Sequence, residues 1–178
     1  MDAEVELATL TSLLDLDEFE VVESNDDRPA RLRRLTLVPV ARAGLCPCCG
    51  QVSGNHHACH DRRVLDLPLG AWRVELTVRL WQFECGNCKR FFTPRFAALA
   101  NGAHATERFL ERLAELAGHG EVANAARFLG IAEKTAEDWY YAYLECKQKE
   151  PAPRLQPVRS LGIDELSLKK DSASSAAC

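Results

Sequence analysis

The sequence predicts an α+β fold in which a β-rich domain precedes a helical domain, and three observations support this order. Two C-x-x-C pairs, in "LCPCCGQ" and "ECGNCKR", are separated by 35 residues that carry β-type patterns. Residues 72–81 alternate apolar and polar side chains with the period of two that is typical of a strand. Residues 106–147 are rich in Ala, Leu and Glu at helical spacing. We therefore expect a sheet built around the cysteines, followed by packed helices.

The composition narrows the class of protein. The chain has 178 residues and a net charge of −4, with a sequence pI of about 5.8, so it is not a basic nucleic-acid binder as a whole. The charge is uneven, because residues 61–100 carry seven bases and four acids, which is compatible with a local DNA-facing surface. The acidic N-terminus lacks an apolar signal region, which argues against a secreted disulfide protein despite eight cysteines. No stretch approaches the roughly 20 apolar residues of a membrane span, so we expect no membrane partner.

Residues 1–30 are predicted to be an acidic N-terminal segment. Ten acids and one base, Arg28, fall within residues 1–28. Apolar spacing over residues 2–16 predicts a short helix, "FEVVES" predicts a strand, and "SNDDRP" predicts a turn.

Residues 31–100 are predicted to form the β domain that carries the cysteines. "RLRRLTLVPVAR" alternates apolar and basic residues and leads as a strand into the first cysteine pair, with four inward positions: Leu32, Leu35, Leu37 and Val40. "QVSGNHHACHDRR" predicts a polar loop. "AWRVELTVRLWQFEC" is the clearest strand of the chain and leads into the second pair.

Two C-x-x-C pairs at the tips of two turns predict a zinc ribbon, in which four thiolates bind one structural Zn²⁺. The predicted ligands are Cys46, Cys49, Cys85 and Cys88. Gly50 permits a left-handed exit from the first turn, and we expect Gly86 to relieve the second turn in the same way. The alternatives are four buried free thiols, or a register in which Cys48 replaces Cys49.

The cluster His56, His57, Cys59 and His60 carries metal-binding side chains. Its spacing matches no closed site, and we interpret it as part of the polar loop, with a second metal as the alternative.

Residues 104–148 are predicted to form a helix-turn-helix domain. Thr106 is placed to cap a helix that ends at Gly118, and a second helix ends at Gly130. A tight turn through residues 129–131 then leads into a third helix, which is the sequence form of a helix-turn-helix. The predicted DNA contacts are Arg127, Lys134, Thr135 and Glu137. The alternative is an ordinary helical hairpin, since the recognition helix is not strongly basic.

The end of the chain is predicted to form a linker and the start of a further domain. Three prolines mark residues 149–158 as a linker. "RSLGIDELSLKK" then begins a strand-like segment that ends in Asp164, and "DSASSAAC" is low in complexity.

These parts in this order resemble the transposases of the ISL-three family of bacterial insertion sequences. The resemblance rests on "CPCCG", on "RRVLDLPLGAWRVELTVRLWQFECGNC", on the helix-turn-helix and on "SLGIDELSLKK", and it covers about residues 30–170. It implies that the zinc ribbon and the helix-turn-helix recognise the terminal inverted repeats of double-stranded DNA. It also implies a cytoplasmic, nucleoid-associated protein and an RNase H-like domain whose first metal-binding acid is Asp164.

The chain departs from the family pattern after Asp164. It stops 14 residues later, so residues 159–178 are expected to be only the truncated start of the RNase H-like domain, followed by a disordered tail. The second Asp and the Glu that would hold Mg²⁺ for strand cleavage are missing. We therefore expect a DNA-recognition module with no activity of its own, which can associate with intact transposase or with itself.

Two other hypotheses stay open at this point. The chain is part of a split or frameshifted transposase, or it is a zinc-dependent protein-interaction module.

Overall fold

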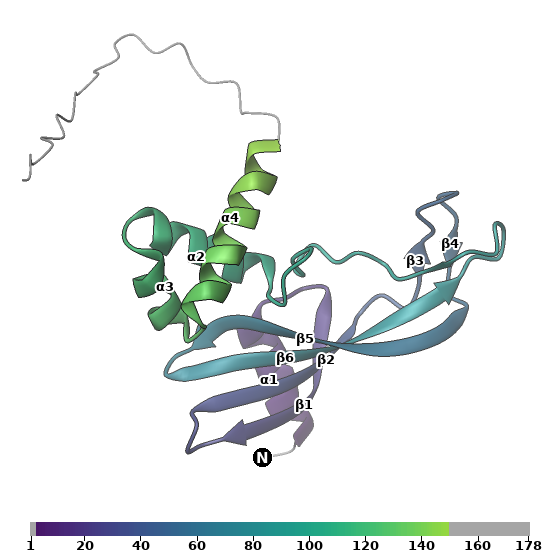
Figure 1. Ribbon diagram of the computed structural model, residues 1–178. Helices are drawn as coiled ribbons and strands as arrows, with labels where there is room; N and C mark the ends of the chain where they lie inside the picture. Colours follow the sequence, from purple (N-terminus) through teal and green to yellow (C-terminus); the bar gives the residue numbers. More distant parts are fainter. Residues whose placement is uncertain (1–2, 150–178) are drawn as a thin grey trace, which may run out of the picture.

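The computed structural model describes residues 3–149 and shows a mixed α+β fold. Within this range lie four helices and a five-stranded sheet (Figure 1). The elements are α1 (Ala3–Leu14), β1 (Phe19–Asp27), β2 (Leu32–Pro39), β3 (Gly44–Leu45), β4 (Val52–Ser53), β5 (His56–Leu69), β6 (Trp72–Glu84), β7 (Phe91–Phe92), α2 (Glu107–Gly118), α3 (Val122–Leu129) and α4 (Glu133–Lys149). The predicted linker, Asp164 and the predicted tail lie outside the described residues.

The sheet has the order β1-β2-β6-β5, with β7 paired to β6. β2 and β6 run parallel, and the other neighbouring pairs run antiparallel. The predicted alternation in β6 is confirmed, because Val74, Leu76, Val78 and Leu80 are buried while the intervening residues are half-exposed. These side chains face α1, which covers one side of the sheet (Figure 1).

Residues 3–27 are part of this sheet and its core. The predicted helix and strand form as α1 and β1, and Leu10, Leu14, Phe19 and Val21 pack with buried residues of β2, β5 and β6. Of the four inward positions predicted in the next strand, Leu32, Leu35 and Leu37 are buried, whereas Val40 lies beyond β2 and is exposed.

Two predictions about irregular segments are wrong. The expected polar loop over residues 51–63 contains β4 and most of β5, which pairs with β6 from His56 opposite Phe83 to Leu69 opposite Trp72. Its first six side chains are all exposed, so no alternation in hydrophobicity marked the strand. The predicted "SNDDRP" turn begins too early, because β1 continues to Asp27 and is held there by an ion pair between Asp26 and Arg33.

The three C-terminal helices pack around a second core. Thr106 caps α2 as predicted, because its hydroxyl accepts a hydrogen bond from the N–H of Phe109. α3 ends at Leu129 and is capped by Gly130, which has φ +70°, and three residues separate α3 from α4. The core contains Leu113 and Leu129, with small residues such as Ala125, Ala126 and Ala136 that let the helices approach. None of the helices in the described range is both long enough and apolar enough to cross a bilayer.

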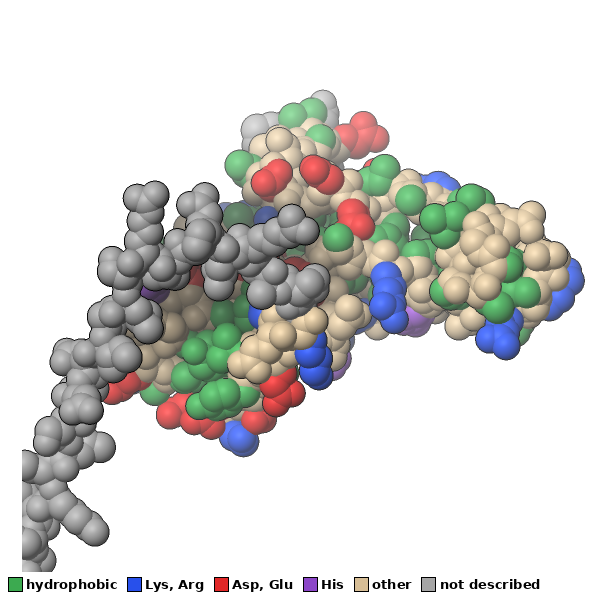
Figure 2. All heavy atoms as spheres, turned by 90° about the horizontal axis from the view of Figure 1, so that it is seen from above, with side chains coloured by type: hydrophobic (Ala, Val, Ile, Leu, Met, Phe, Trp, Pro, Cys, Tyr) green, Lys and Arg blue, Asp and Glu red, His purple; other side chains and the backbone are tan. Residues whose placement is uncertain are grey.

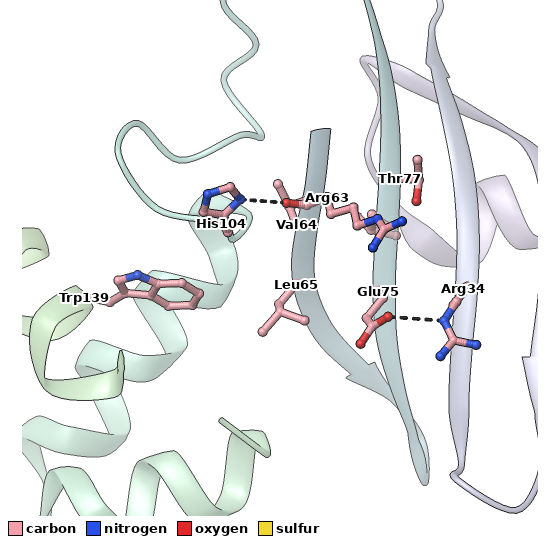
Figure 3. A pocket seen from close by; sticks show the side chains of 9 residues that line it. Arg34, Arg63, Val64, Leu65, Glu75, Thr77, His104 and Trp139 are labelled. Atoms are coloured by element: carbon pink, nitrogen blue, oxygen red, sulfur yellow. Dashed lines mark hydrogen bonds and ion pairs between the residues drawn. The ribbon is translucent and has the colours of Figure 1, made fainter. Parts of the chain in front are cut away.

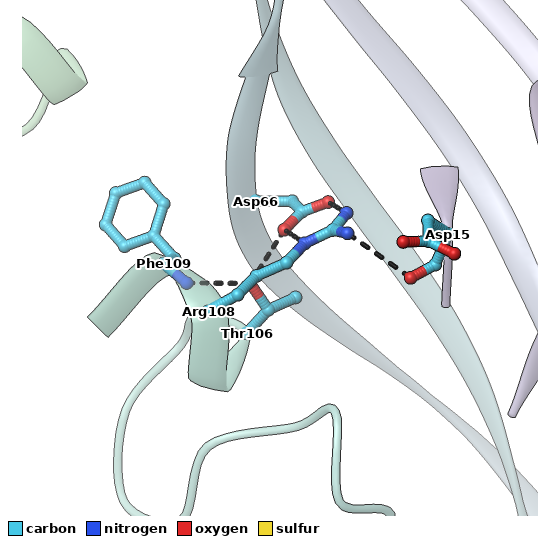
Figure 4. A network of polar contacts seen from close by, with 5 residues as sticks. All are labelled: Asp15, Asp66, Thr106, Arg108 and Phe109. Atoms are coloured by element: carbon cyan, nitrogen blue, oxygen red, sulfur yellow. Dashed lines mark hydrogen bonds and ion pairs between the residues drawn. The ribbon is translucent and has the colours of Figure 1, made fainter. Parts of the chain in front are cut away.

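One buried polar network joins the helices to the sheet (Figure 4). The Asp66 carboxylate on β5 is fully buried and accepts hydrogen bonds from the Thr106 hydroxyl at 2.7 Å and from Arg108 Nε at 2.8 Å. A second bond runs from Arg108 Nη2 to Asp66 Oδ2, and Nη1 donates to the Asp15 carbonyl at 3.4 Å. The network therefore fixes the start of α2 against the sheet and against the end of α1.

Candidate metal centre and flanking surfaces

The two cysteine pairs meet at the end of the sheet that is remote from the helices (Figure 1). β3 and β4 form a short hairpin that carries Cys46 and Cys49, and β6 and β7 form the hairpin that carries Cys85 and Cys88. We call the two turns the first knuckle (residues 46–51) and the second knuckle (residues 85–90). The hydroxyl of Ser53 donates to the Glu84 carbonyl at 2.6 Å and ties the hairpins together.

The four thiols have the geometry of a tetrahedral metal site. All four Sγ atoms lie within 4.8 Å of one another. The Cys46–Cys88 and Cys49–Cys85 Sγ pairs are each 3.5 Å apart. Four sulfurs around a Zn²⁺ at about 2.3 Å would be about 3.8 Å from one another. The cluster therefore needs only small adjustments of these separations to hold a metal ion, and it is compatible with structural zinc.

The two knuckles repeat the same backbone pattern. The N–H of Cys46 donates to the carbonyl of Gln51, and the carbonyl of Cys46 accepts from the N–H of Gly50. Cys85 makes the same two bonds, donating to the carbonyl of Arg90 and accepting from the N–H of Lys89. The residue after the second cysteine has positive φ in both, +71° at Gly50 and +57° at Lys89. Gly86, which we expected to relieve the second knuckle, has no positive φ, and Lys89 adopts the left-handed conformation instead.

Hydrogen bonds inside each knuckle favour the thiolate form at its first cysteine. Backbone N–H groups of Cys88 and Asn87 lower the pKa of Cys85 to about 6, against the opposing effect of burial. The backbone N–H groups of Cys49 and Cys48 lower the pKa of Cys46 in the same way. At Cys88 the N–H of Arg90 also lowers the pKa, but burial and the three neighbouring thiols outweigh it and raise the pKa to about 12. The lowered pKa values of Cys46 and Cys85 favour the thiolate, the form that binds a metal ion.

Neither alternative metal ligand joins this cluster. Cys48 is exposed and is not one of the four grouped thiols. Among the described residues no group that could hold a metal includes His56, His57, Cys59 or His60. His56 instead contacts the rings of Trp81 and Phe83, and His57 stacks on Phe91 at 4.0 Å between ring centroids.

The four predicted DNA-contact residues lie on or beside the α3–α4 turn. Arg127 is exposed near the end of α3, where it donates to the Asn124 side chain at 2.9 Å. Lys134 is exposed in the first turn of α4 and pairs with Asp138 at 2.7 Å and with Glu137 at 3.9 Å. Thr135 is half-buried. Because the acids outnumber Lys134, the exposed start of α4 is acidic.

A hollow of about 410 Å³ separates α4 from the outer face of the sheet (Figure 3). Trp139 and His104 border it on the helical side, and Arg34, Arg63 and Thr77 border it on the sheet. Arg34 pairs with Glu75 at 3.4 Å. The hollow is therefore a mixed polar and apolar groove without a strong charge of either sign.

Sequence reasoning missed two features of this arrangement. The backbone conformation of Lys89 gave no signal, because lysine is not a residue expected at positive φ. The partners of Asp66 lie 40 and 42 residues away. A lone acid within the apolar "VLDLPL" was the available signal for that network.

The fold and the site define a mixed α+β protein with a candidate four-cysteine metal centre. The chain is similar to the transposase for insertion sequence element IS1001 from Bordetella parapertussis, with 32% identity over 154 residues. The similarity covers 85% of this chain but only 36% of that transposase. No family model and no solved structure matches the chain.

Proposed function

We propose that the chain is a DNA-recognition region of an insertion-sequence transposase, which binds the terminal inverted repeats of its element. The observation that carries this proposal is the similarity to the IS1001 transposase over 85% of the chain. The thiol cluster and the α3–α4 turn supply the two parts that such a region needs, a rigid metal-held module and a helix pair. Membership of the ISL-three family is also part of the proposal, because the similarity supports only the broader class of insertion-sequence transposases.

The metal centre is proposed to be a zinc ribbon that acts structurally. Cys46, Cys49, Cys85 and Cys88 would bind one Zn²⁺, leaving no open coordination position for a substrate. The buried residues around it include only two large side chains, Phe83 and Phe92, besides Cys46 and Cys85. Such a small core is a weak source of stability, so a metal that joins the hairpins would supply most of the cohesion at this end.

The helices α3 and α4 are proposed to form a helix-turn-helix. The three-residue turn and the left-handed Gly130 fit this motif. In this arrangement α4 would lie in the major groove, where Lys134, Thr135 and Glu137 would reach bases, while Arg127 would reach the backbone. Lys134 would have to exchange Asp138 for DNA, which lowers its net contribution.

Catalysis belongs to the whole transposase and is a separate proposal. Asp164 would be the first Mg²⁺-binding acid of an RNase H-like domain, and it lies outside the described residues. Nothing in residues 3–149 is required to cleave DNA for the recognition proposal to hold.

Fluorescence anisotropy on labelled duplexes tests the recognition proposal. Zinc-loaded protein is titrated into the terminal repeat of its element and into a scrambled duplex, at two salt concentrations and again after chelation. We expect preferential binding of the repeat, weakened by salt and lost with the metal. Equal affinity for both duplexes, from folded zinc-loaded protein, would contradict sequence-specific recognition.

A further inference from the structure

We propose that the second knuckle is the part of the chain that grips the DNA backbone, with Lys89 and Arg90 each binding a phosphate of the duplex. This inference rests on the proposed DNA recognition and deepens it. It places the main electrostatic contact at the metal centre and not at the start of α4.

The loops at the knuckle end of the molecule carry an excess of positive charge. Residues 40–60 and 85–95 carry the two knuckles, and neither segment contains an Asp or a Glu, although Glu84 directly precedes the second knuckle. Together they contain four cations, Arg42, Lys89, Arg90 and Arg95. On the face seen in Figure 2, Lys and Arg side chains lie around this end and acidic side chains lie elsewhere. A duplex carries a phosphate charge about every 1.7 Å along its axis, so a surface where cations outnumber acids is where its backbone binds most favourably.

Acidic partners do not neutralise the second knuckle. Among the described residues, no hydrogen bond or ion pair engages the side chains of Lys89, Arg90 or Arg95, whereas Arg42 pairs with Glu20. Both Lys89 and Arg90 are exposed. At the start of α4, by contrast, Lys134 already has two acidic partners. Phosphate can therefore bind the knuckle cations without first breaking an intramolecular pair.

The two knuckles differ in the residue that occupies their position of positive φ, which is Lys89 in the second knuckle. Gly50 occupies the equivalent position in the first knuckle, where positive φ suits glycine. Lys89 adopts the same region at φ +57°, which is unfavourable for a residue with a Cβ. The residues that follow these two also differ in charge, since Gln51 in the first knuckle is neutral and Arg90 in the second is positive. Two cations thus occupy a turn that glycine and glutamine are sufficient to form.

A flat aromatic surface adjoins these cations. Phe91 follows Arg90, is 52% exposed, and stacks on His57 with an angle of 26° between the rings. An exposed ring pair beside two cations provides apolar contact for the sugars of a strand whose phosphates the cations bind. The knuckle therefore offers the two kinds of contact that position a duplex without reading its sequence.

The test converts the second knuckle into a copy of the first with the double variant Lys89→Gly, Arg90→Gln. The matched control is Arg28→Gln, Arg31→Gly in the β1–β2 turn, where both side chains are exposed and Arg31 also has positive φ, +49°. Neither side chain forms a hydrogen bond or ion pair within residues 3–149, although the charge of Arg28 helps to lower the pKa of Asp26. The carbonyl of Arg31 accepts from Arg73 at the start of β6, so the control lies about 40 Å from the knuckle along the 13 residues of that strand. Each double variant removes two charges and one strained residue.

Binding to the terminal-repeat duplex is measured between about 50 and 200 mM salt, and bound zinc is measured for every protein. We expect the knuckle variant to keep one zinc per chain and to bind roughly fiftyfold more weakly near 0.1 M salt. Its log–log salt slope should be smaller by about 1.8, while the control keeps the wild-type slope.

Four outcomes would overturn the proposal. An unchanged slope in the knuckle variant, with wild-type binding intact, rejects the knuckle contact but leaves DNA recognition standing. An equal loss of DNA affinity in the knuckle variant and in the control would mean that binding depends on the total charge of the protein and not on a contact at the knuckle. Loss of zinc from the knuckle variant assigns the two cations to neutralising the thiolates. If the zinc-loaded wild type binds no DNA, the proposed function fails together with this inference.

Discussion

The two ends of the sheet are held together by different physical means. The helical end has a core of eleven buried residues and a buried ion pair that joins it to β5. The knuckle end has four buried residues, two of which are cysteines of the candidate metal centre. Packing alone can maintain the first region, whereas the second depends on a bond to metal in the zinc ribbon that we propose. On this proposal, one chain contains a region that folds by burial and another that folds by coordination, on the same strands.

Replacing a metal ligand should separate the two ends most strongly. In Cys85→Ser the buried hydroxyl is a poor zinc ligand, so we expect bound zinc to fall from one per chain to none. Structural zinc in small modules contributes on the order of 10 kcal/mol to folding. Hydrogen exchange should then show lost protection in β3, β4 and β7 while the amides of α2 keep theirs.

Cys48→Ser is the matched control for this change. Cys48 lies in the first knuckle but outside the four-thiol group, so its replacement should leave zinc content and exchange unchanged. Loss of zinc from Cys48→Ser would support the alternative register in which Cys48 is a ligand. Collapse of α2 protection in Cys85→Ser would contradict the independence of the two ends.

Removing the buried carboxylate should weaken the helical end next most strongly. Asp66→Ala leaves Arg108 and the Thr106 hydroxyl without their shared acceptor. Breaking a fully buried pair by removing one partner costs about 3–5 kcal/mol, and we expect a smaller loss here because the Arg108 side chain is 28% exposed. We expect a lower urea midpoint for the helical signal in circular dichroism, with zinc content unchanged.

An exposed ion pair on the same helix provides the comparison. Arg112 and Glu115 on α2 pair at 2.7 Å with about half of each side chain exposed. Arg112→Ala should therefore change stability by less than about 1 kcal/mol. If both variants lost the same stability, the Asp66 network would be no more than a surface contact.

The sequence predicted local motifs and helix bounds better than it predicted the contacts between residues that are far apart along the chain. The ligand set follows from local spacing, since C-x-x-C brings two sulfurs together within one turn, and the structure groups all four. The bounds of α2 follow from Thr106 and Gly118, which are also local signals. The first half of β5 was missed because its exposed side chains give no buried face that would impose alternation. The parallel pairing of β2 with β6 and the Asp66 network depend on residues far apart in sequence, which a pattern along the chain does not encode.

The smallest effect that we expect is a difference in zinc affinity between variants of the first knuckle and of the second. Gly50→Ala places a Cβ at φ +71° with no atom within 4 Å of it, so its cost is limited to the backbone conformation, of order 1 kcal/mol. Lys89→Gly removes the same cost from the second knuckle, partly offset by the greater freedom of glycine in the unfolded chain. Because metal binding and knuckle folding are coupled, we expect Gly50→Ala to weaken zinc affinity about fivefold and Lys89→Gly to strengthen it by less than that. Competition with a chromophoric chelator measures both. Weaker zinc binding in Lys89→Gly would mean that the lysine charge stabilises the thiolates more than its backbone strain costs, and the two knuckles would then differ in electrostatics as well as in sequence.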